Sequence, residues 1–279
     1  MSKPFFAILL ALAAATCWGS ADFAGALAAR RSDSFRAVLV AYSVGLATLL
    51  AVALARGETL LLDTNLIWGM LSGIFGMLAV IFLWRGLAVG RMGVVAPVSA
   101  VLATAIPVIV EALTTGLPRT LQLIGFGVAL VGIWLLSRPE RLGSRPKGLG
   151  MAILSGLGFG ATFTALGQIS GEAIFWPMTA GRVVACGGMM IFALVTGRPL
   201  ALRSTPLRLL IMAGVIDILG NIFFLLATQN GRLDIAAVLA SLYPAMTAIL
   251  ARLTLKEHLT RPQFIGFGAA ALGIILITL

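Results

Sequence analysis

The sequence predicts an all-α polytopic membrane protein with ten transmembrane helices, arranged as two inverted five-helix repeats. Three observations lead to this fold class. The composition is 60% hydrophobic and only 11% charged, with a mean hydropathy of +1.06, which is far from the usual mix of a soluble domain. Apolar runs of about 18 to 25 residues, long enough to cross a bilayer, follow one another with short loops between them. The chain also matches itself at a fixed offset.

The expected helices take up nearly the whole chain. They cover residues 5–29, 36–55, 65–87, 92–114, 120–137, 148–170, 174–196, 206–228, 233–254 and 262–279. The longest connection, RPERLGSRPKG, joins the fifth helix to the sixth and is too short for a soluble domain. Residues 1–20 share features of a signal peptide, but this segment belongs to the internal repeat, so we expect it to be retained as the first helix.

The internal repeat has an offset of 141 residues. LQLIGFGVALVGI (121–133) aligns without gaps with PQFIGFGAAALGI (262–274), and Gly90-Arg91 aligns with Gly231-Arg232. We therefore expect two homologous halves, 1–141 and 142–279. With five helices in each half, the second half must insert upside down relative to the first, which is typical of secondary transporters.

Basic residues lie mainly on one side of the expected membrane. Fifteen Lys and Arg fall in the loops after helices one, three, five, seven and nine, and four fall on the other side: Lys3, Arg56, Arg119 and Arg232. The positive-inside rule then places both termini on the non-cytoplasmic side of the membrane. We expect this membrane to be the cell's inner (plasma) membrane. The net charge of +10 is thus explained by membrane orientation, and no continuous basic face indicates nucleic acid.

The sequence offers no motif for metal, cofactor or nucleotide. Cys17 and Cys186 lie apart in apolar segments, there is one histidine, His258, and no HExxH, GxSxG or GxxxxGK[ST] occurs. We therefore expect no cofactor, no metal and no enzymatic activity. An intramembrane enzyme that uses isolated carboxylates, or a membrane scaffold without transport activity, remains the alternative.

Trp18-Gly19 in the first helix and an IGFG...G helix closing each half give the chain a family resemblance. It resembles the EamA branch of the drug/metabolite transporter superfamily over essentially its whole length. The resemblance implies that helices one, three, four, six, eight and nine surround a cavity, with five and ten at the edge. It also implies export or exchange of small organic solutes such as amino acids or drugs.

The chain departs from the family pattern in two places. The turn after the fourth helix is TTGLPRT (114–120), without the acidic-basic pattern that LKEHLTR (255–261) keeps in the second half. Relatives also often place both termini in the cytoplasm, opposite to the charge count.

The eighth helix carries the clearest polar stripe. Asp217, Asn221, Phe224 and Thr228 follow i, i+4, i+7 and i+11 and share one helical face. Lipid cannot satisfy such a stripe, so it is expected to face protein or water. We interpret it as a cavity wall that offers a carboxylate and an amide to a polar solute, with a helix-helix hydrogen bond as the alternative.

The first and seventh helices add further charges. Trp18 and Asp22 stand at i and i+4, so Trp18 could supply a flat apolar contact and Asp22 a charge or a titratable proton. Asp22 could equally form a structural pair with Arg85 or Arg91. Arg182 could bind a solute or form an ion pair with Asp217 or Glu172, and we favour the ion pair.

Three prolines lie within expected helices: Pro97 and Pro107 in the fourth, and Pro244 in its counterpart, the ninth. Internal prolines free carbonyls and bend helices, so these positions are expected to form kinks or gates. Tyr243, next to Pro244, is expected to form an aromatic wall. The expected partners are a small-molecule substrate, protons and the lipid bilayer, with the chain as a monomer or homodimer working by alternating access.

Overall fold

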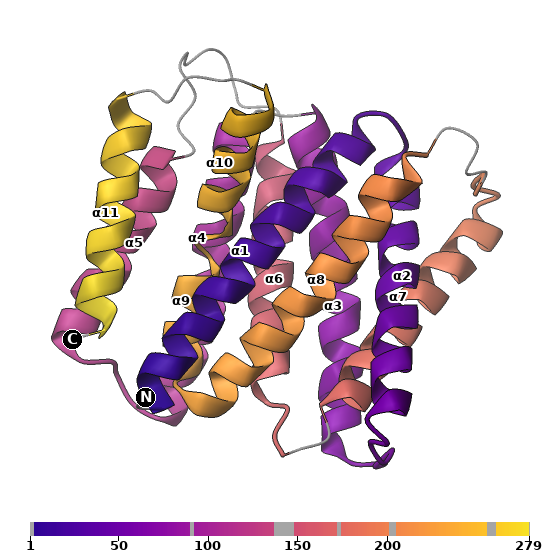
Figure 1. Cartoon of the computed structure of the whole chain (residues 1–279), viewed down its shortest axis with the longest axis horizontal. Coiled ribbons are helices and arrows are strands. Elements are labelled where there is room, and N and C mark those ends of the chain that lie inside the picture. The colour runs from indigo at the N-terminus through magenta and orange to yellow at the C-terminus, as the bar shows by residue number, and fades with distance from the viewer. Residues whose placement is uncertain are drawn as a thin grey trace.

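The computed structural model describes residues 3–89, 92–136, 148–171, 174–200, 205–255 and 261–278, and the regular elements in these ranges are all α-helices. They are α1 (Lys3–Ala29), α2 (Ser34–Ala55), α3 (Thr64–Val89), α4 (Met92–Thr114), α5 (Thr120–Leu136), α6 (Leu149–Gly167), α7 (Phe175–Val195), α8 (Leu207–Asn230), α9 (Leu233–Ala240), α10 (Tyr243–Leu255) and α11 (Arg261–Thr278). Figure 1 shows them as one bundle whose helices run between its two ends. The expected all-α fold is confirmed.

The helices follow the predicted segments closely, except in the ninth. The expected helix 233–254 consists of α9 and α10, separated by Ser241 and Leu242. Pro244 follows this break, and because it has no N–H it cannot continue the helical hydrogen bonds. Pro107 and Pro97 lie within α4, which is continuous, and the side chain of Pro97 is outside the described part of the structure.

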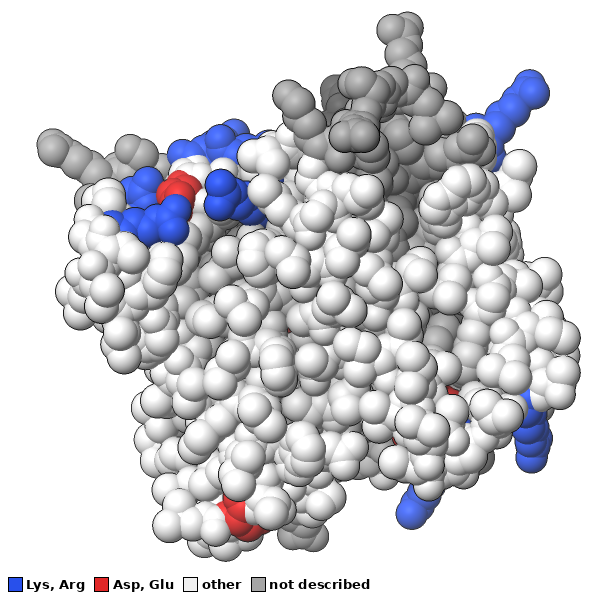
Figure 2. All heavy atoms as spheres, turned by 180° about the vertical axis from the view of Figure 1, so that it is seen from behind, with Lys and Arg blue, Asp and Glu red and all other residues white. Residues whose placement is uncertain are grey.

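The outer surface of the bundle is apolar over its middle. Large side chains such as Phe75, Met190 and Leu219 stay exposed there. On the face shown in Figure 2, most charged residues gather at the two ends, with an apolar zone between them. Helices α1, α2, α3, α6, α7 and α8 are long and apolar enough to cross a membrane, and the remaining segments contain shorter apolar helices. The chain therefore has the surface of an integral membrane protein.

The packing of the helices repeats when the two halves are exchanged. At the offset of 141 residues, α1 corresponds to α6, α3 to α8, and α4 to α9 and α10 together. α1 packs on α8, α9 and α10, as α6 packs on α3 and α4, while α2 and α7 pack on each other. Both chain ends lie at the same end of the bundle (Figure 1). This pattern fits a two-repeat architecture, and the expected boundary at residue 141 lies outside the described residues.

The two glycine-rich closing helices, α5 and α11, pack against each other at one edge of the bundle (Figure 1). Gly132 and its repeat counterpart Gly273 lie at this contact. A Cβ on Gly132 would meet the backbone of Gly266 and Ala270, and a Cβ on Gly273 would meet Ala129. The IGFG...G repeat is thus explained by close approach of two helices.

The α3–α7 contact also depends on glycine. A Cβ on Gly69 would meet the backbone of Pro177, and a Cβ on Gly73 would meet that of Gly181. The two helix backbones therefore touch, which brings the α7 side chains that follow Gly181 into the interior of the bundle. The Gly69-xxx-Gly73 pattern thus permits the close packing of α3 and α7.

Candidate functional site

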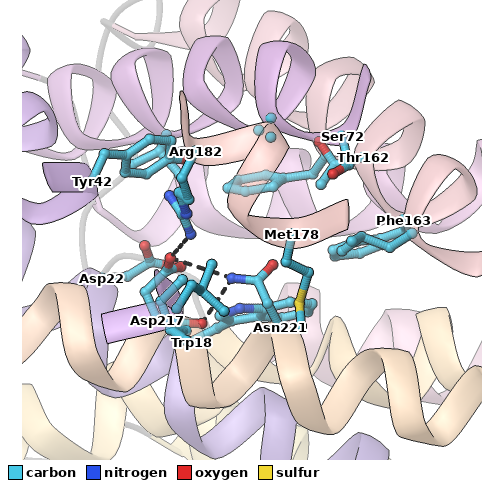
Figure 3. A pocket seen from close by; sticks show the side chains of 18 of the residues that line it. Trp18, Asp22, Tyr42, Ser72, Thr162, Phe163, Met178, Arg182, Asp217 and Asn221 are labelled. Carbon is cyan, nitrogen blue, oxygen red and sulfur yellow. Dashed lines mark hydrogen bonds and ion pairs between the residues drawn. The ribbon is translucent and has the colours of Figure 1, made fainter. Parts of the chain in front are cut away.

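A cavity lies inside the bundle, between α1, α2, α3, α6, α7, α8 and the start of α10 (Figure 3). The space free of protein atoms, its open mouth included, is about 690 Å³. Its polar lining consists of Asp22, Tyr42, Ser72, Thr162, Arg182, Asp217, Asn221 and Tyr243, and its aromatic lining includes Trp18, Phe159 and Phe163.

An ion pair between Arg182 of α7 and Asp217 of α8 stands at the centre of the cavity (Figure 3). Asn221, one turn along α8, donates its Nδ2 to the Asp217 backbone carbonyl at 2.8 Å and to Oδ2 at 3.3 Å. The guanidinium carbon of Arg182 lies 3.7 Å from the centroid of the Tyr42 ring. The arginine is thus held by a carboxylate and by an aromatic face, a favourable cation–π geometry.

Asp22 of α1 supplies a second carboxylate to the same cavity. Its Oδ1 accepts a hydrogen bond from Trp84 Nε1 of α3 at 3.0 Å. The indole reaches Asp22 because Gly25, one turn further along α1, has no side chain: a Cβ there would overlap the Trp84 ring. Asp22 is 7% exposed, and no ion pair of the described residues involves it.

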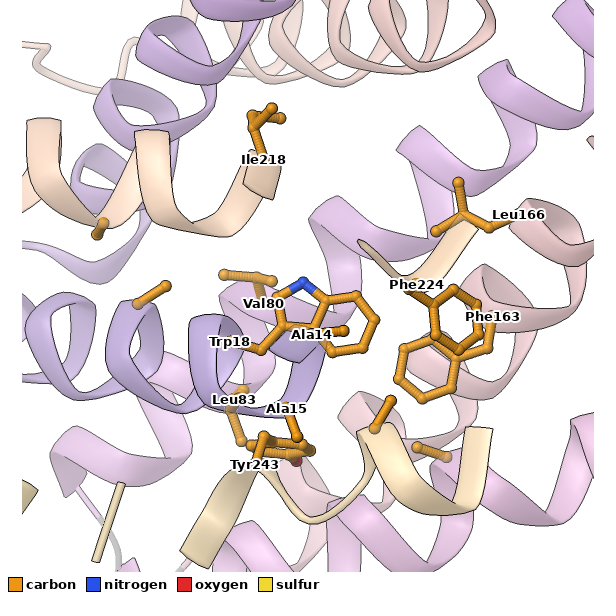
Figure 4. Close-up of a cluster of buried hydrophobic side chains, with 14 of the residues drawn as sticks. Ala14, Ala15, Trp18, Val80, Leu83, Phe163, Leu166, Ile218, Phe224 and Tyr243 are labelled. Atoms are coloured by element: carbon orange, nitrogen blue, oxygen red, sulfur yellow. The ribbon is translucent and has the colours of Figure 1, made fainter. Parts of the chain in front are cut away.

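An aromatic cluster forms the wall next to these charges (Figure 4). Trp18 stacks on Phe163 with 5.1 Å between ring centroids, and Phe224 packs against Phe163 at 4.9 Å and against Trp18 at 5.4 Å. Gly220 makes room for the indole, because a Cβ there would meet the Trp18 ring. Trp18 and Phe163 line the cavity, whereas Phe224 is fully buried behind them.

Six of the expected site residues meet at this cavity: Trp18, Asp22, Arg182, Asp217, Asn221 and Tyr243. Four other expected residues lie outside the described lining, and the side chain of Pro97 is not described. Thr228 donates its hydroxyl to the Leu225 carbonyl at 2.8 Å, which is a bond within α8. Phe224 belongs to the core. Pro107 lies in α4 and Pro244 in α10.

Each charged residue of the cavity has an uncharged residue at the equivalent position of the other half. At the offset of 141, Asp22 corresponds to Phe163, Asp217 to Gly76 and Arg182 to Ala41. The two-repeat fold therefore does not require these charges. They are specific to the site, which is asymmetric although the helices around it repeat.

The walls of the cavity differ from those that the family resemblance implied. Tyr42 and Leu49 of α2 and Met178 and Arg182 of α7 line it, whereas no described residue of α4 does. The expected ninth helix contributes Tyr243, which lies at the start of α10. The close α3–α7 approach explains the presence of α7. Helix seven was not among the helices that the resemblance places around the cavity, so its part in the lining is a departure from that arrangement.

Sequence reasoning did not single out two residues that hold the charges, Tyr42 and Trp84. Tyr42 is one of only two tyrosines, and a hydroxyl within an otherwise apolar run could have identified it as a candidate site residue. Trp84 had no comparable signal, because tryptophan is common near helix ends in membranes. In the described residues, no group of three or more His, Cys, Asp or Glu gathers to hold a metal ion.

Comparison with known proteins gives three results. Two stretches of the chain, 5–138 and 146–279, each match the EamA-like transporter family. An uncharacterized protein of Methanocaldococcus jannaschii is 38% identical over 69 residues, which are 25% of this chain and about half, 50%, of that relative's length. A solved structure described only as the crystal structure of a protein has a TM-score of 0.74 at 17% identity, over 97% of this chain and 95% of that one. At this identity it shows likeness of fold alone.

Proposed function

The chain belongs to the EamA-like transporter family, and from this premise we propose that it is a secondary transporter that moves small organic metabolites by alternating access. Membership makes it a membrane transporter of the drug/metabolite transporter superfamily. The proposal adds the substrate class, small amino-acid-like solutes or drugs, and the mode, export or exchange.

The observation that carries the proposal is the set of charges in the cavity. Asp22, Arg182 and Asp217 all line one space in the interior of an apolar bundle. A charged side chain inside a membrane is costly, by roughly 2.5–3.5 kcal/mol on insertion scales, so such residues usually face a solute path. Of these three, Arg182 and Asp217 form an ion pair, and no basic side chain of the described residues pairs with Asp22. A scaffold without transport activity would not need the uncompensated carboxylate.

Alternating access requires contacts between the halves that can break and re-form. At the end of the bundle that holds the termini, Glu58 from the first half accepts from the backbone N–H groups of Phe175 and Trp176 at 3.2 and 2.9 Å. Beside it, Asn65 exchanges two hydrogen bonds with the backbone of Ser170, at 3.1 Å each. The Glu58 bonds cap α7 from outside its own half, and both sets of bonds tie the two halves together at this end.

At the opposite end, Arg198 of the second half pairs with Asp33 of the first at 3.2 Å. The Arg198 guanidinium also lies 4.9 Å from the Phe35 ring centroid. Contacts between the halves therefore exist at both ends, and we propose that each set opens in turn.

We further propose that α9 and α10 together form one crossing, which with the other helices gives ten crossings in two inverted repeats. The charge bias supports both termini on the non-cytoplasmic side of the plasma membrane. A C-terminal reporter fusion tests the orientation. A reporter active only in the cytoplasm would contradict it.

Transport itself is tested in proteoliposomes loaded with a mixture of metabolites, by mass spectrometry of what leaves or exchanges. We expect saturable flux with the wild type, and strongly reduced flux with Asp22→Asn and Asp217→Asn. Asp63→Asn is the matched control, because Asp63 is exposed in a loop where asparagine can also accept the Asn65 N–H bond. Wild-type liposomes without flux, or unchanged flux in both cavity variants, would sink the proposal and favour a scaffold.

A further inference from the structure

We propose that the cavity selects solutes with one net positive charge, protonated amines that also carry a neutral acceptor oxygen, over zwitterions and anions. Asp22 is the counter-charge of the amine. This inference deepens the proposed function, since it takes the cavity as the solute site.

The first argument is the charge balance of the lining. Of its charged residues, Arg182 and Asp217 neutralise each other in the ion pair. Among the described residues, Asp22 accepts the indole N–H of Trp84, and no basic side chain pairs with it. When Asp22 is ionised, the described lining therefore carries one negative charge without a counter-charge. Figure 3 shows Asp22 beside Asp217.

This charge favours a cation for a simple electrostatic reason. A carboxylate buried inside the bundle is less well solvated than in water, and an ammonium group next to it restores both neutrality and hydrogen bonds. A zwitterion brings an ammonium and a second carboxylate, so the cavity keeps its net charge of minus one. An anion raises the net charge to minus two. The order of binding expected from the lining is therefore cation, zwitterion, anion.

The second argument is the presence of two buried donors without partners. The Nη1 of Arg182 and the hydroxyl of Tyr243 have no hydrogen-bond partner, although both residues line the cavity and are more than nine-tenths buried. An unmet buried donor is costly, so a solute with an acceptor oxygen is favoured. That oxygen does not need a charge, because Asp217 already neutralises Arg182. An amino alcohol, an amino ester or an amino amide has this chemistry.

The third argument is the aromatic surface beside Asp22. Trp18 and Phe163 are stacked on each other, and Phe159 continues the cluster 6.1 Å from Phe163. Aromatic faces attract organic cations and the apolar parts of a solute alike. The lining therefore fits an amine with an aromatic or large apolar side chain.

Isothermal titration calorimetry on the purified full chain in detergent at neutral pH tests the inference. The probes are phenylalaninol, phenylalanine and 3-phenylpropionate, which share the phenyl ring and chain and carry a net charge of plus one, zero and minus one. We expect phenylalaninol to bind at least about tenfold more tightly than phenylalanine, and 3-phenylpropionate to bind most weakly. Asp22→Asn should weaken the binding of phenylalaninol by about tenfold or more, because the lining becomes neutral. The same substitution should leave the binding of phenylalanine unchanged or make it tighter. Asp63→Asn should keep the wild-type order.

Three results would overturn the inference: phenylalanine binding at least as tightly as phenylalaninol in the wild type, no binding of phenylalaninol, or equal weakening of all probes by Asp22→Asn. Should Asp22→Asn fail to fold, the wild-type order of the three probes decides alone. The calorimetry does not depend on transport. If zwitterions are transported and phenylalanine binds more tightly than phenylalaninol, this inference fails and the transporter proposal stands. If phenylalaninol binds as expected but no solute is transported, the transporter proposal fails and this inference stands.

Discussion

Removal of Arg182 alone should destabilise the protein far more than removal of the whole Arg182–Asp217 pair. The side chains of Arg182 and Asp217 are only 9% and 21% exposed. Arg182→Met leaves the Asp217 carboxylate with Asn221 as its hydrogen-bond partner and no counter-charge. Loss of one member of a buried pair typically costs about 3–5 kcal/mol, and the partial exposure of Asp217 places the expected cost near the lower figure, about 3 kcal/mol.

The double variant Arg182→Met/Asp217→Leu should regain most of this stability. Replacing a buried pair by apolar side chains of similar volume is often neutral or stabilising, and Met can still lie against the Tyr42 ring. The chain also offers a matched surface pair: in Arg198–Asp33 the side chains are 37% and 33% exposed. Arg198→Met should therefore cost about 1 kcal/mol or less.

The measurement is the free energy of unfolding in mixed micelles, from SDS titration followed by far-UV circular dichroism. A cost for Arg182→Met no larger than that for Arg198→Met would refute the reasoning. So would a double variant no more stable than Arg182→Met, because the penalty would then not come from an isolated carboxylate. The double variant should also lose flux in proteoliposomes while remaining folded, which separates the stability of the pair from its role in transport.

Three further perturbations test the packing and the end contacts. Gly73→Ala should lower the free energy of unfolding by about 1–3 kcal/mol, because its Cβ would overlap the Gly181 backbone. The control is Gly187→Ala, because a Cβ on Gly187 has no neighbour within 4 Å. In the same titration it should change the free energy of unfolding by less than about 1 kcal/mol. Glu58→Ala should remove about 0.5–2 kcal/mol of capping from α7 and speed hydrogen exchange at Phe175 and Trp176; unchanged exchange would contradict the assigned cap. Pro244→Ala should slow hydrogen exchange at residues 241–245 and reduce flux, because it lets α9 and α10 join; equal flux would show that the break is not needed.

Most of the fold could be predicted from the sequence. The helices begin and end within a few residues of the expected segments because the apolar runs are long and the loops are short. The IGFG...G repeat predicted equivalent closing helices, and these pack together through Gly132 and Gly273. Pro244 was the sequence feature that indicated the break between α9 and α10. A proline by itself does not predict such a break, because α4 is continuous through two prolines.

The candidate site could be predicted in part. The i, i+4 spacing of Asp217 and Asn221 on one helix and of Trp18 and Asp22 on another identified four residues that line the cavity. The same periodicity included Phe224 and Thr228, which lie outside the described lining. A stripe along a helix defines a face but not how far the cavity extends along it, and the rings of Trp18 and Phe163 pack against Phe224.

What the sequence determined by itself is the membrane character, the repeat and the presence of charges at helix centres, because each follows from composition and spacing along one segment. Tertiary structure decided which charges meet. Arg182 and Asp217 are 35 residues apart, and Asp22 and Trp84 are 62 apart. Their contacts depend on glycines: Gly69 and Gly73 let α3 approach α7, and Gly25 leaves room on α1 for the Trp84 ring. Helix packing therefore paired Arg182 with Asp217 and, among the described residues, placed no cation beside Asp22, an arrangement that no single helix encodes.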